Sequence, residues 1–383
     1  MAFLTSVGEL KSALQRVMPA IEKWSAFPSL TCARLEKGTV TATNRDLRIA
    51  ADFNGEGALD PVLVPAKALF QTLDNRRPDM PVEIARDGDA VSVKIDGAVS
   101  FLMAGDISDW PDFAPAAGPG VPLSKTFHKG LIHCAPFISD EHTRYYLHGV
   151  YLDGDTLVAT DGHALGHHPA GGDLGIKAIL HKDMILAALS LPAARSLVFD
   201  GSRKVATLRG PDFEITAKVI DGYFPDWRLV VPDPADARFF AEFDGAELTR
   251  ALRRIQPFAD DPHRYVCLAI GGGGAGLSTI YAGGAFSAHP LSPVAHTPLQ
   301  SDDDDQQMFY CAVNGVYLAR VLGRLRGAER VRLSFFKADG EGPFLASAAP
   351  AGDSGLVQMP LRGQSRFRNS AVACLDAVAG TAG

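Results

Sequence analysis

The sequence has few cysteines, no long apolar run and no recognisable leader. Its five cysteines are widely spaced and form no CxxC pair, which argues against a zinc ribbon or a disulfide framework and fits a reducing cytoplasm. No apolar stretch approaches the roughly 18–20 residues needed to cross a bilayer. The N-terminus lacks the basic start and apolar core of a secretory signal. We therefore expect a cytoplasmic protein that is not associated with a membrane.

The chain also lacks an excess of basic charge. Its formal net charge of −7 argues against a conventional DNA-binding domain, because neutralisation of phosphates by basic side chains dominates affinity for nucleic acid. The same charge is compatible with a protein that surrounds DNA loosely and keeps an acidic outer face. With 383 residues, 46% hydrophobic and 21% charged, the chain has the composition of a soluble globular protein of two or three domains.

What the sequence does contain is an internal repeat. A first helix, with helical apolar spacing and a final proline that ends it, is predicted over residues 8–19, 246–257 and, more weakly, 127–136. A second helix with one shared apolar spacing is predicted over residues 65–73, 181–189 and 314–322. Strand-like segments follow each of these second helices.

The repeat predicts an α+β fold of three similar domains, each with two helices among antiparallel strands. The phrases Trp110-Pro-Asp-Phe113 and Phe224-Pro-Asp-Trp227 close the first two copies, and proline-rich stretches follow both. A period of about 120 residues is too long for a solenoid, so an arc or a ring is the more natural arrangement. The predicted domains cover residues 1–119, 120–236 and 237–363, and residues 364–383 form a C-terminal extension.

A β-hairpin is predicted over residues 144–165. Apolar and polar residues alternate on both sides of the turn at residues 153–155, and the second strand ends in a polar corner, Thr160-Asp161-Gly162-His163. This corner has side chains able to face solvent beside the apolar neighbours Leu147 and Leu165. The hairpin is therefore a candidate for a binding surface.

This hairpin and three phrases further along the chain resemble the bacterial DNA polymerase III β sliding clamps. The phrases are RYYLHGVYL with LVATDGHAL, then IDGYFPDWRLVVP, VNGVYLARVL and LVQMPLR, in that family's order over nearly the whole chain. The resemblance implies a non-catalytic processivity factor for DNA replication. It implies head-to-tail protomers that form a homodimer, closing a ring of six domains around double-stranded DNA without sequence preference. It also implies that DNA polymerase and the clamp loader dock through short peptide motifs, and that no cofactor or metal is needed.

In that family the helices line the hole of the ring. The resemblance therefore implies a sparse basic lining that attracts phosphates without reading bases. Ordinary solvated helix faces are the alternative interpretation of these charges. The residues that would face DNA are Lys11, Arg16, Lys67, Lys129, Arg144, Tyr145, Tyr146, Lys182, Arg250, Arg253, Arg254, Arg320 and Arg324.

The resemblance also implies a partner pocket at the junction of the second and third domains. An apolar groove with a few polar rim groups suits a short extended peptide. Packing of an interdomain core is the alternative interpretation for Leu147 and Val230. The pocket residues carried over from the family are Leu147, Thr160, Gly162, His163, Leu165, Pro225, Val230, Asn314, Tyr317, Val357, Met359, Pro360, Leu361 and Arg362.

Four residues match the family's dimer interface: Phe101, Met103, Pro257 and Phe258. Core packing is the rival explanation for Phe101. Two pocket positions depart from the family, because Ala164 and Leu229 stand where basic residues are usual. A further departure is the C-terminal extension, for which we consider the hypothesis that it folds back over the pocket. The departures also leave open a specialised or mobile-element clamp that serves a different polymerase.

A metal-dependent enzyme is the alternative from another class. Asp161, His163, His167 and His168 lie close together in sequence, although no third ligand motif accompanies them. The glycines at 271–274 lack the Lys-Ser/Thr of a phosphate loop and are predicted to form a flexible hairpin turn. The acidic run 302–305 is predicted to be a solvated loop. No catalytic constellation is recognisable in the sequence.

Overall fold

The computed structural model describes residues 2–259, 264–271, 274–280, 286–298, 308–337, 339–348 and 354–381. The chain divides into two compact units. Unit 1 comprises Met1–Ala135, His148–Asp155 and Ala170–Gly222, and unit 2 comprises Pro136–Leu147, Thr156–Pro169 and Tyr223–Gly383. The division into three domains that the repeat indicates stays a prediction.

Unit 1 contains two antiparallel arrays of strands. The first has the order β5 (Glu56–Gly57), β1 (Ala2–Ser6), β7 (Pro81–Asp87), β8 (Ala90–Ile95) and β9 (Ala98–Met103). The second has the order β6 (Val62–Pro65), β2 (Cys32–Glu36), β3 (Thr39–Thr43), β4 (Leu47–Asp52), β17 (Phe213–Ile220), β16 (Val205–Arg209), β15 (Ser196–Asp200) and β10 (Val121–Pro122). Strand β14 (Lys177–His181) also pairs with β17, and β11 (Gly149–Asp153) pairs with β14.

Unit 2 is built in the same way from two antiparallel arrays. The first has the order β12 (Thr156–Thr160), β13 (Ala164–Pro169), β26 (Gly355–Gln358), β25 (Phe344–Ala348), β24 (Arg330–Phe335), β18 (Phe239–Asp244) and β22 (Pro293–His296). The second has the order β21 (Phe286–Leu291), β20 (Gly274–Ile280), β19 (Tyr265–Gly271) and β23 (Met308–Asn314).

All six predicted helices are present, and they pack in pairs. The pairs are α1 (Val7–Val17) with α2 (Ala66–Leu73), α3 (Lys125–Cys134) with α4 (Lys182–Leu189), and α5 (Gly245–Ile255) with α6 (Gly315–Arg324). Together with the antiparallel strands they confirm the predicted α+β class. No helix in the described part of the chain is both long and apolar enough to cross a membrane.

The first helix of each pair begins at a side-chain cap. The Ser6 hydroxyl accepts a hydrogen bond from the Glu9 N–H, and the Asp244 carboxylate accepts one from the Glu247 N–H. These caps satisfy N–H groups that have no partner inside the helix. Helix α5 buries its leucine and isoleucine face and leaves Arg250, among other arginines, exposed. Helix α5 thus has one apolar face and one basic face.

One sequence prediction fails at the start of the predicted hairpin. Residues His142–Leu147 form a 3₁₀ segment instead of a strand, and the first strand, β11, begins only at Gly149. Arg144 forms an ion pair with Glu141, and the Leu147 carbonyl accepts a hydrogen bond from the Ser139 N–H. These local contacts satisfy polar groups within the turn, and they override the alternating pattern.

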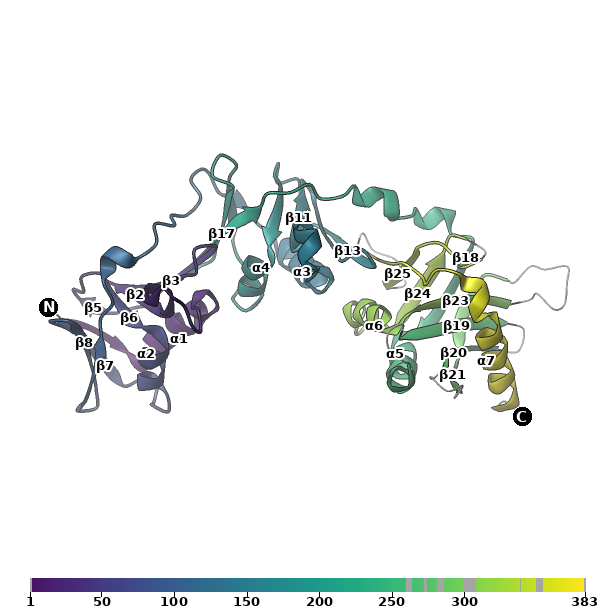
Figure 1. Cartoon of the computed structure of the whole chain (residues 1–383), viewed down its shortest axis with the longest axis horizontal. Coiled ribbons are helices and arrows are strands. Elements are labelled where there is room, and N and C mark those ends of the chain that lie inside the picture. The colour runs from purple at the N-terminus through teal and green to yellow at the C-terminus, as the bar shows by residue number, and fades with distance from the viewer. Residues whose placement is uncertain are drawn as a thin grey trace. The chain divides into compact units, whose positions relative to one another are not determined.

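The C-terminal extension forms a 3₁₀ turn, Gln364–Phe367, followed by helix α7 (Arg368–Thr381). In Figure 1 this yellow helix lies along β19, β20 and β21, and contacts join it to all three strands. Phe367, Ala371 and Cys374 form a buried cluster with Cys267 and other residues of that sheet. Burial raises the pKa of the Cys374 thiol to about 11, as expected for a cysteine that serves as a core residue.

We expect Phe367→Ala to destabilise the docking of α7 on its sheet. The Phe367 ring is 7% exposed and its centroid lies 4.8 Å from that of Tyr265, so truncation leaves a cavity that costs about 3–5 kcal/mol. Native-state hydrogen exchange of the β19 and β20 amides measures this loss. Val372→Ala is the matched control, because Val372 lies on α7, directly after the turn that carries Phe367, and is 38% exposed. Equal protection in both variants would contradict the role given to Phe367.

Candidate functional site

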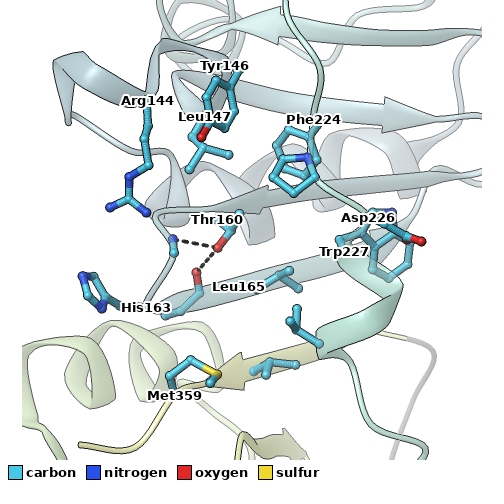
Figure 2. Close-up of a pocket in the computed structure, with 15 residues that line it drawn as sticks. Arg144, Tyr146, Leu147, Thr160, His163, Leu165, Phe224, Asp226, Trp227 and Met359 are labelled. Atoms are coloured by element: carbon cyan, nitrogen blue, oxygen red, sulfur yellow. Dashed lines mark hydrogen bonds between the residues drawn. The ribbon is translucent and has the colours of Figure 1, made fainter. Parts of the chain in front are cut away.

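A pocket of about 250 Å³ lies within unit 2. It is formed by the 3₁₀ segment before β11, the corner between β12 and β13, the segment Phe224–Val230, and the end of β26 (Figure 2). The lining residues are Arg144, Tyr146, Leu147, Thr160, Gly162, His163, Ala164, Leu165, Phe224, Pro225, Asp226, Trp227, Val230, Val357 and Met359.

The pocket has a buried apolar floor and a half-exposed apolar rim. Leu147, Leu165 and Val357 are almost fully buried, whereas Val230 and Met359 are 42% and 40% exposed. The buried floor residues give the pocket a fixed shape. The apolar surface of the rim residues is removed from water only when a ligand binds. The volume is below the range of about 300–1,000 Å³ that is usual for small-molecule sites. The pocket therefore fits apolar side chains of a peptide better than a large cofactor.

The corner from Thr160 to Ala164 is held by its own hydrogen bonds. The Thr160 hydroxyl donates to the Ala164 carbonyl (2.8 Å) and accepts from the Gly162 N–H (3.0 Å), as the dashed lines in Figure 2 show. The Asp161 carboxylate accepts from the N–H groups of His163 and Ala164, both at 2.9 Å. Gly162 has φ +87°, a conformation that other residues rarely adopt. The residue types of the corner therefore determine its backbone.

A cluster of four side chains joins this corner to helix α6. Arg320 forms an ion pair with the second carboxylate oxygen of Asp161, and its guanidinium carbon lies 5.2 Å from the centroid of the Tyr317 ring. The Tyr317 ring stacks on His163, with centroids 5.0 Å apart and an interplanar angle of 12°. Burial raises the pKa of Tyr317, and the nearby Asp161 carboxylate adds to the effect. Asp161 is thus occupied by structural partners on both oxygens.

The opposite wall of the pocket is formed by Trp227. Figure 2 shows Trp227 and Asp226 on the side away from Arg144 and His163. The centroid of the His167 ring lies 5.4 Å from that of Trp227. Burial lowers the pKa of His167 to about 4, and His168 adds a smaller contribution. His167 therefore supports the wall as a neutral ring.

The structure brings most of the predicted pocket residues together. The lining includes nine of them: Leu147, Thr160, Gly162, His163, Leu165, Pro225, Val230, Val357 and Met359. Five others lie outside the lining: Asn314, Tyr317, Pro360, Leu361 and Arg362. The Asn314 side chain caps α6 by accepting a hydrogen bond from the Val316 N–H. The Tyr317 ring stacks on His163. Leu361 packs against the cluster that contains Phe367, Ala371 and Cys374.

Sequence reasoning missed several members of the lining. Phe224, Asp226 and Trp227 belong to the phrase that closes the second repeat. The available signal was the pair of aromatic rings beside Pro225, which was itself predicted to line the pocket. Arg144 and Tyr146, which were predicted to face DNA, line the pocket, and they lie in the 3₁₀ segment that stands in place of the expected strand. Their contact with DNA stays a prediction.

The predicted basic residues have different surroundings. Lys11 forms an ion pair with Asp74 (2.8 Å), Arg16 with Asp212, and Arg320 with Asp161. The side chains of Tyr145 (53% exposed) and of several helical cations are exposed: Lys67, Lys129, Arg250, Arg253 and Arg254. Lys182 and Arg324 are half-buried.

The predicted interface residues are exposed. Phe101 and Met103, on the edge strand β9, are 63% and 70% exposed, which excludes core packing as the role of Phe101 within this chain. Phe258 is 51% exposed, and Pro257 is also exposed. Large apolar side chains on an open sheet edge are unfavourable in a solitary protein.

Two hypotheses about this region are wrong. Within its described residues, 364–381, the C-terminal extension does not cover the pocket: α7 packs on the sheet of β19 to β21, and none of these residues lines the pocket. The histidines near Asp161 do not converge, because His163 stacks on Tyr317 while His167 packs on Trp227. Among the residues that the structure describes, no group of three potential metal ligands lies together.

Two predicted loops include residues that lie outside the described part of the chain. Strands β19 and β20 pair up to Gly271 and Gly274, which confirms a hairpin around the glycine-rich turn, although residues 272–273 lie outside the described residues. The acidic run 302–305 also lies outside them.

Comparisons with known proteins show that the chain is similar to bacterial β sliding clamps. The β sliding clamp of Pseudomonas aeruginosa is 26% identical over 375 residues, covering 92% of this chain and 97% of that protein. The β sliding clamp of Caulobacter vibrioides is 27% identical over 387 residues, with the same coverage of both chains. No protein-family model matches the chain.

The fold agrees with these relatives. The crystal structure of the DNA polymerase III β subunit of Pseudomonas aeruginosa has a TM-score of 0.81 and 22% identity, covering 94% of this chain and all of that one. The resemblance to the bacterial β sliding clamps, predicted from five phrases of sequence, is therefore confirmed over most of the chain.

We expect the pocket wall to lose stability as pH falls from 6.5 towards 4. In this window the unfolded chain protonates His167, whose ordinary pKa is 6.5, while the folded chain keeps it neutral with a pKa of about 4. Protons then favour the unfolded state, so the free energy of unfolding decreases on acidification. Urea unfolding followed by tryptophan fluorescence at pH 7 and pH 5 measures the change. His167→Gln should reduce this pH dependence, and an unaltered dependence would contradict it.

Proposed function

We propose that this chain is a DNA sliding clamp that holds the replicative polymerase on its template. The observation that carries the proposal is the pocket in unit 2, which assembles from segments far apart in a chain that matches β sliding clamps over 92% of its length. The protein acts by binding, as a cytoplasmic processivity factor without a catalytic centre of its own.

The proposed partner on the inside of the ring is double-stranded DNA. Exposed cations occur on the helices, with Lys67 on α2, Lys129 on α3, and Arg250 and Arg253 on α5. Lysines and arginines on helix faces attract the phosphates of any sequence, so a lining that meets the DNA backbone and not the base edges holds DNA without sequence preference and allows it to slide. A net charge of −7 then reflects the rest of the surface.

The proposed ring is a head-to-tail homodimer of protomers with three similar domains each. Phe101 and Met103 project from edge strand β9, and Phe258 ends the segment that follows α5. A second copy that covers these groups removes their apolar surface from water and gives the open edge of β9 a partner. The two sets of residues differ, as a head-to-tail contact requires.

The proposed partners at the pocket are polymerase and clamp loader, each through a short peptide. The floor of Leu147, Leu165 and Val357 accepts an apolar side chain, and the polar corner at His163 borders it. Ala164 and the 83% exposed Leu229 replace basic residues that are usual in the family. The peptide is accordingly held more by apolar contact than by charge.

We expect Val230→Asp to weaken the binding of a clamp-binding peptide by tenfold or more. The substitution puts a charge on the half-exposed rim, where the bound peptide would exclude it from water. Fluorescence anisotropy of a labelled peptide from a clamp-dependent polymerase measures the affinity. Val294→Asp is the control, because Val294 is 48% exposed and lies on β22, outside the pocket lining. Unchanged peptide affinity in Val230→Asp would remove this pocket from the proposal.

We expect Phe101→Asp to shift the dimer towards monomer by about 2 kcal/mol or more, the loss typical of an aromatic anchor at an interface. Light scattering after size-exclusion chromatography over a dilution series measures the equilibrium. Tyr223→Asp changes an aromatic residue that is 81% exposed and should leave the dimer intact. A wild-type protein that is monomeric at every concentration would contradict the ring.

A further inference from the structure

Two large aromatic rings project from the loop that follows helix α1. Trp24 is 84% exposed and Phe27 is 51% exposed, although both are ring types whose burial contributes strongly to stability. Neither residue serves the pocket or the proposed dimer interface. The loop lies in unit 1, a few residues beyond the end of α1 at Val17.

The loop presents these rings on a fixed backbone. The Glu22 N–H donates to the Leu30 carbonyl (3.0 Å), and the Leu30 N–H donates to the Phe27 carbonyl (3.0 Å). The Ser25 hydroxyl accepts from the Phe27 N–H at 3.2 Å. Because the backbone is ordered before anything binds, a ligand that stacks on the rings loses little of its affinity to the ordering of the loop.

A second loop places a cation on one of the rings. The guanidinium carbon of Arg45 lies 4.1 Å from the centroid of the Phe27 ring. Arg45 has φ +79°, in the left-handed region that residues other than glycine seldom occupy. A residue keeps such a conformation only where the surrounding structure holds it there.

Hydrogen bonds of the same pattern as those at the pocket corner hold Arg45 in this conformation. The Thr43 hydroxyl donates to the Leu47 carbonyl (3.0 Å) and accepts from the Arg45 N–H (3.1 Å). The Asn44 side chain accepts from the N–H groups of Asp46 and Leu47. The two repeats therefore contain corners with the same hydrogen-bond pattern, one with Gly162 and the other with Arg45 at the same position.

The charges near the rings favour an anionic ligand. Lys23 is exposed beside Trp24, and Arg45 is exposed over Phe27. Of the two carboxylates in these loops, Asp46 forms an ion pair with Lys218 (2.8 Å), and Glu22 is half-buried. Exposed rings interleaved with cations are the arrangement by which proteins bind single-stranded nucleic acid, the rings stacking on bases and the cations meeting phosphates.

We propose that the surface made by Lys23, Trp24, Phe27 and Arg45 binds unpaired bases of DNA by stacking. The inference rests on the proposed function, because a clamp at a primer end has single-stranded template next to the duplex that it encircles. Paired bases are stacked inside a duplex and offer a protein mainly phosphate and groove edges. The rings therefore distinguish single-stranded from double-stranded DNA.

The test compares a 15-nucleotide oligo-dT with a blunt duplex of equal length, using the full chain and fluorescence anisotropy at low salt. We expect Trp24→Ala to weaken oligo-dT binding at least about fivefold, since one stacked base is worth roughly 1–3 kcal/mol. Trp24→Phe should recover most of the affinity, and duplex binding should be unchanged. Quenching of tryptophan fluorescence by oligo-dT should disappear in Trp24→Ala.

Tyr223→Ala is the matched control, since it removes an equally exposed aromatic ring from unit 2. Equal losses for oligo-dT and duplex in Trp24→Ala would overturn stacking in favour of a backbone contact. Unchanged oligo-dT affinity would overturn the inference while leaving the clamp function intact, which is tested separately by the dimer and the peptide. Loss of peptide binding instead of oligo-dT binding would assign the surface to a protein partner and also overturn it.

Discussion

The pocket depends on one set of backbone contacts, the antiparallel pairing of β13 with β26. Residue pairs Ala164–Gln358 to His167–Gly355 are in register, and the Met359 N–H donates to the His163 carbonyl at 2.9 Å. This pairing puts the last strand of the chain beside a corner almost 200 residues earlier. Without it, Val357 and Met359 have no fixed position relative to Leu165. The remaining features, the Asp161–Arg320 ion pair and the His167–Trp227 contact, stabilise what the pairing creates.

A similar antiparallel pairing between distant strands occurs within unit 1, where β4 pairs with β17. In each case a strand that follows a Thr-led corner pairs with a strand from a later repeat. The two corners share their threonine and their pattern of hydrogen bonds, but the third residue is Gly162 in one and Arg45 in the other. A glycine leaves room beside the corner, where the Arg144 side chain lies, and an arginine carries a charge onto Phe27. Duplication of one scaffold has thus given surfaces of different chemistry.

Much of this was predictable from the sequence, since helices with strong apolar spacing and capping residues depend on local interactions. All six repeated helices are found, and nine of fourteen predicted pocket residues line the pocket. The failures concern competition between local and distant contacts. Arg144 to Leu147 alternate like a strand, but an ion pair to Glu141 and a hydrogen bond to Ser139 make a turn. Leu361 was expected in the pocket but packs on the α7 cluster, whose position no repeat could indicate.

The function proposed for this protein requires that it hold DNA by surrounding it. The most direct measurement is retention on DNA of two topologies, after assembly on a nicked circle by the clamp loader of its host with ATP. We expect the protein to stay with the circle during gel filtration at moderate salt. We also expect it to be lost once a restriction enzyme linearises the circle, because a sliding ring leaves through a free end. Equal retention on circular and linear DNA would show that the protein binds DNA by contact alone and does not surround it.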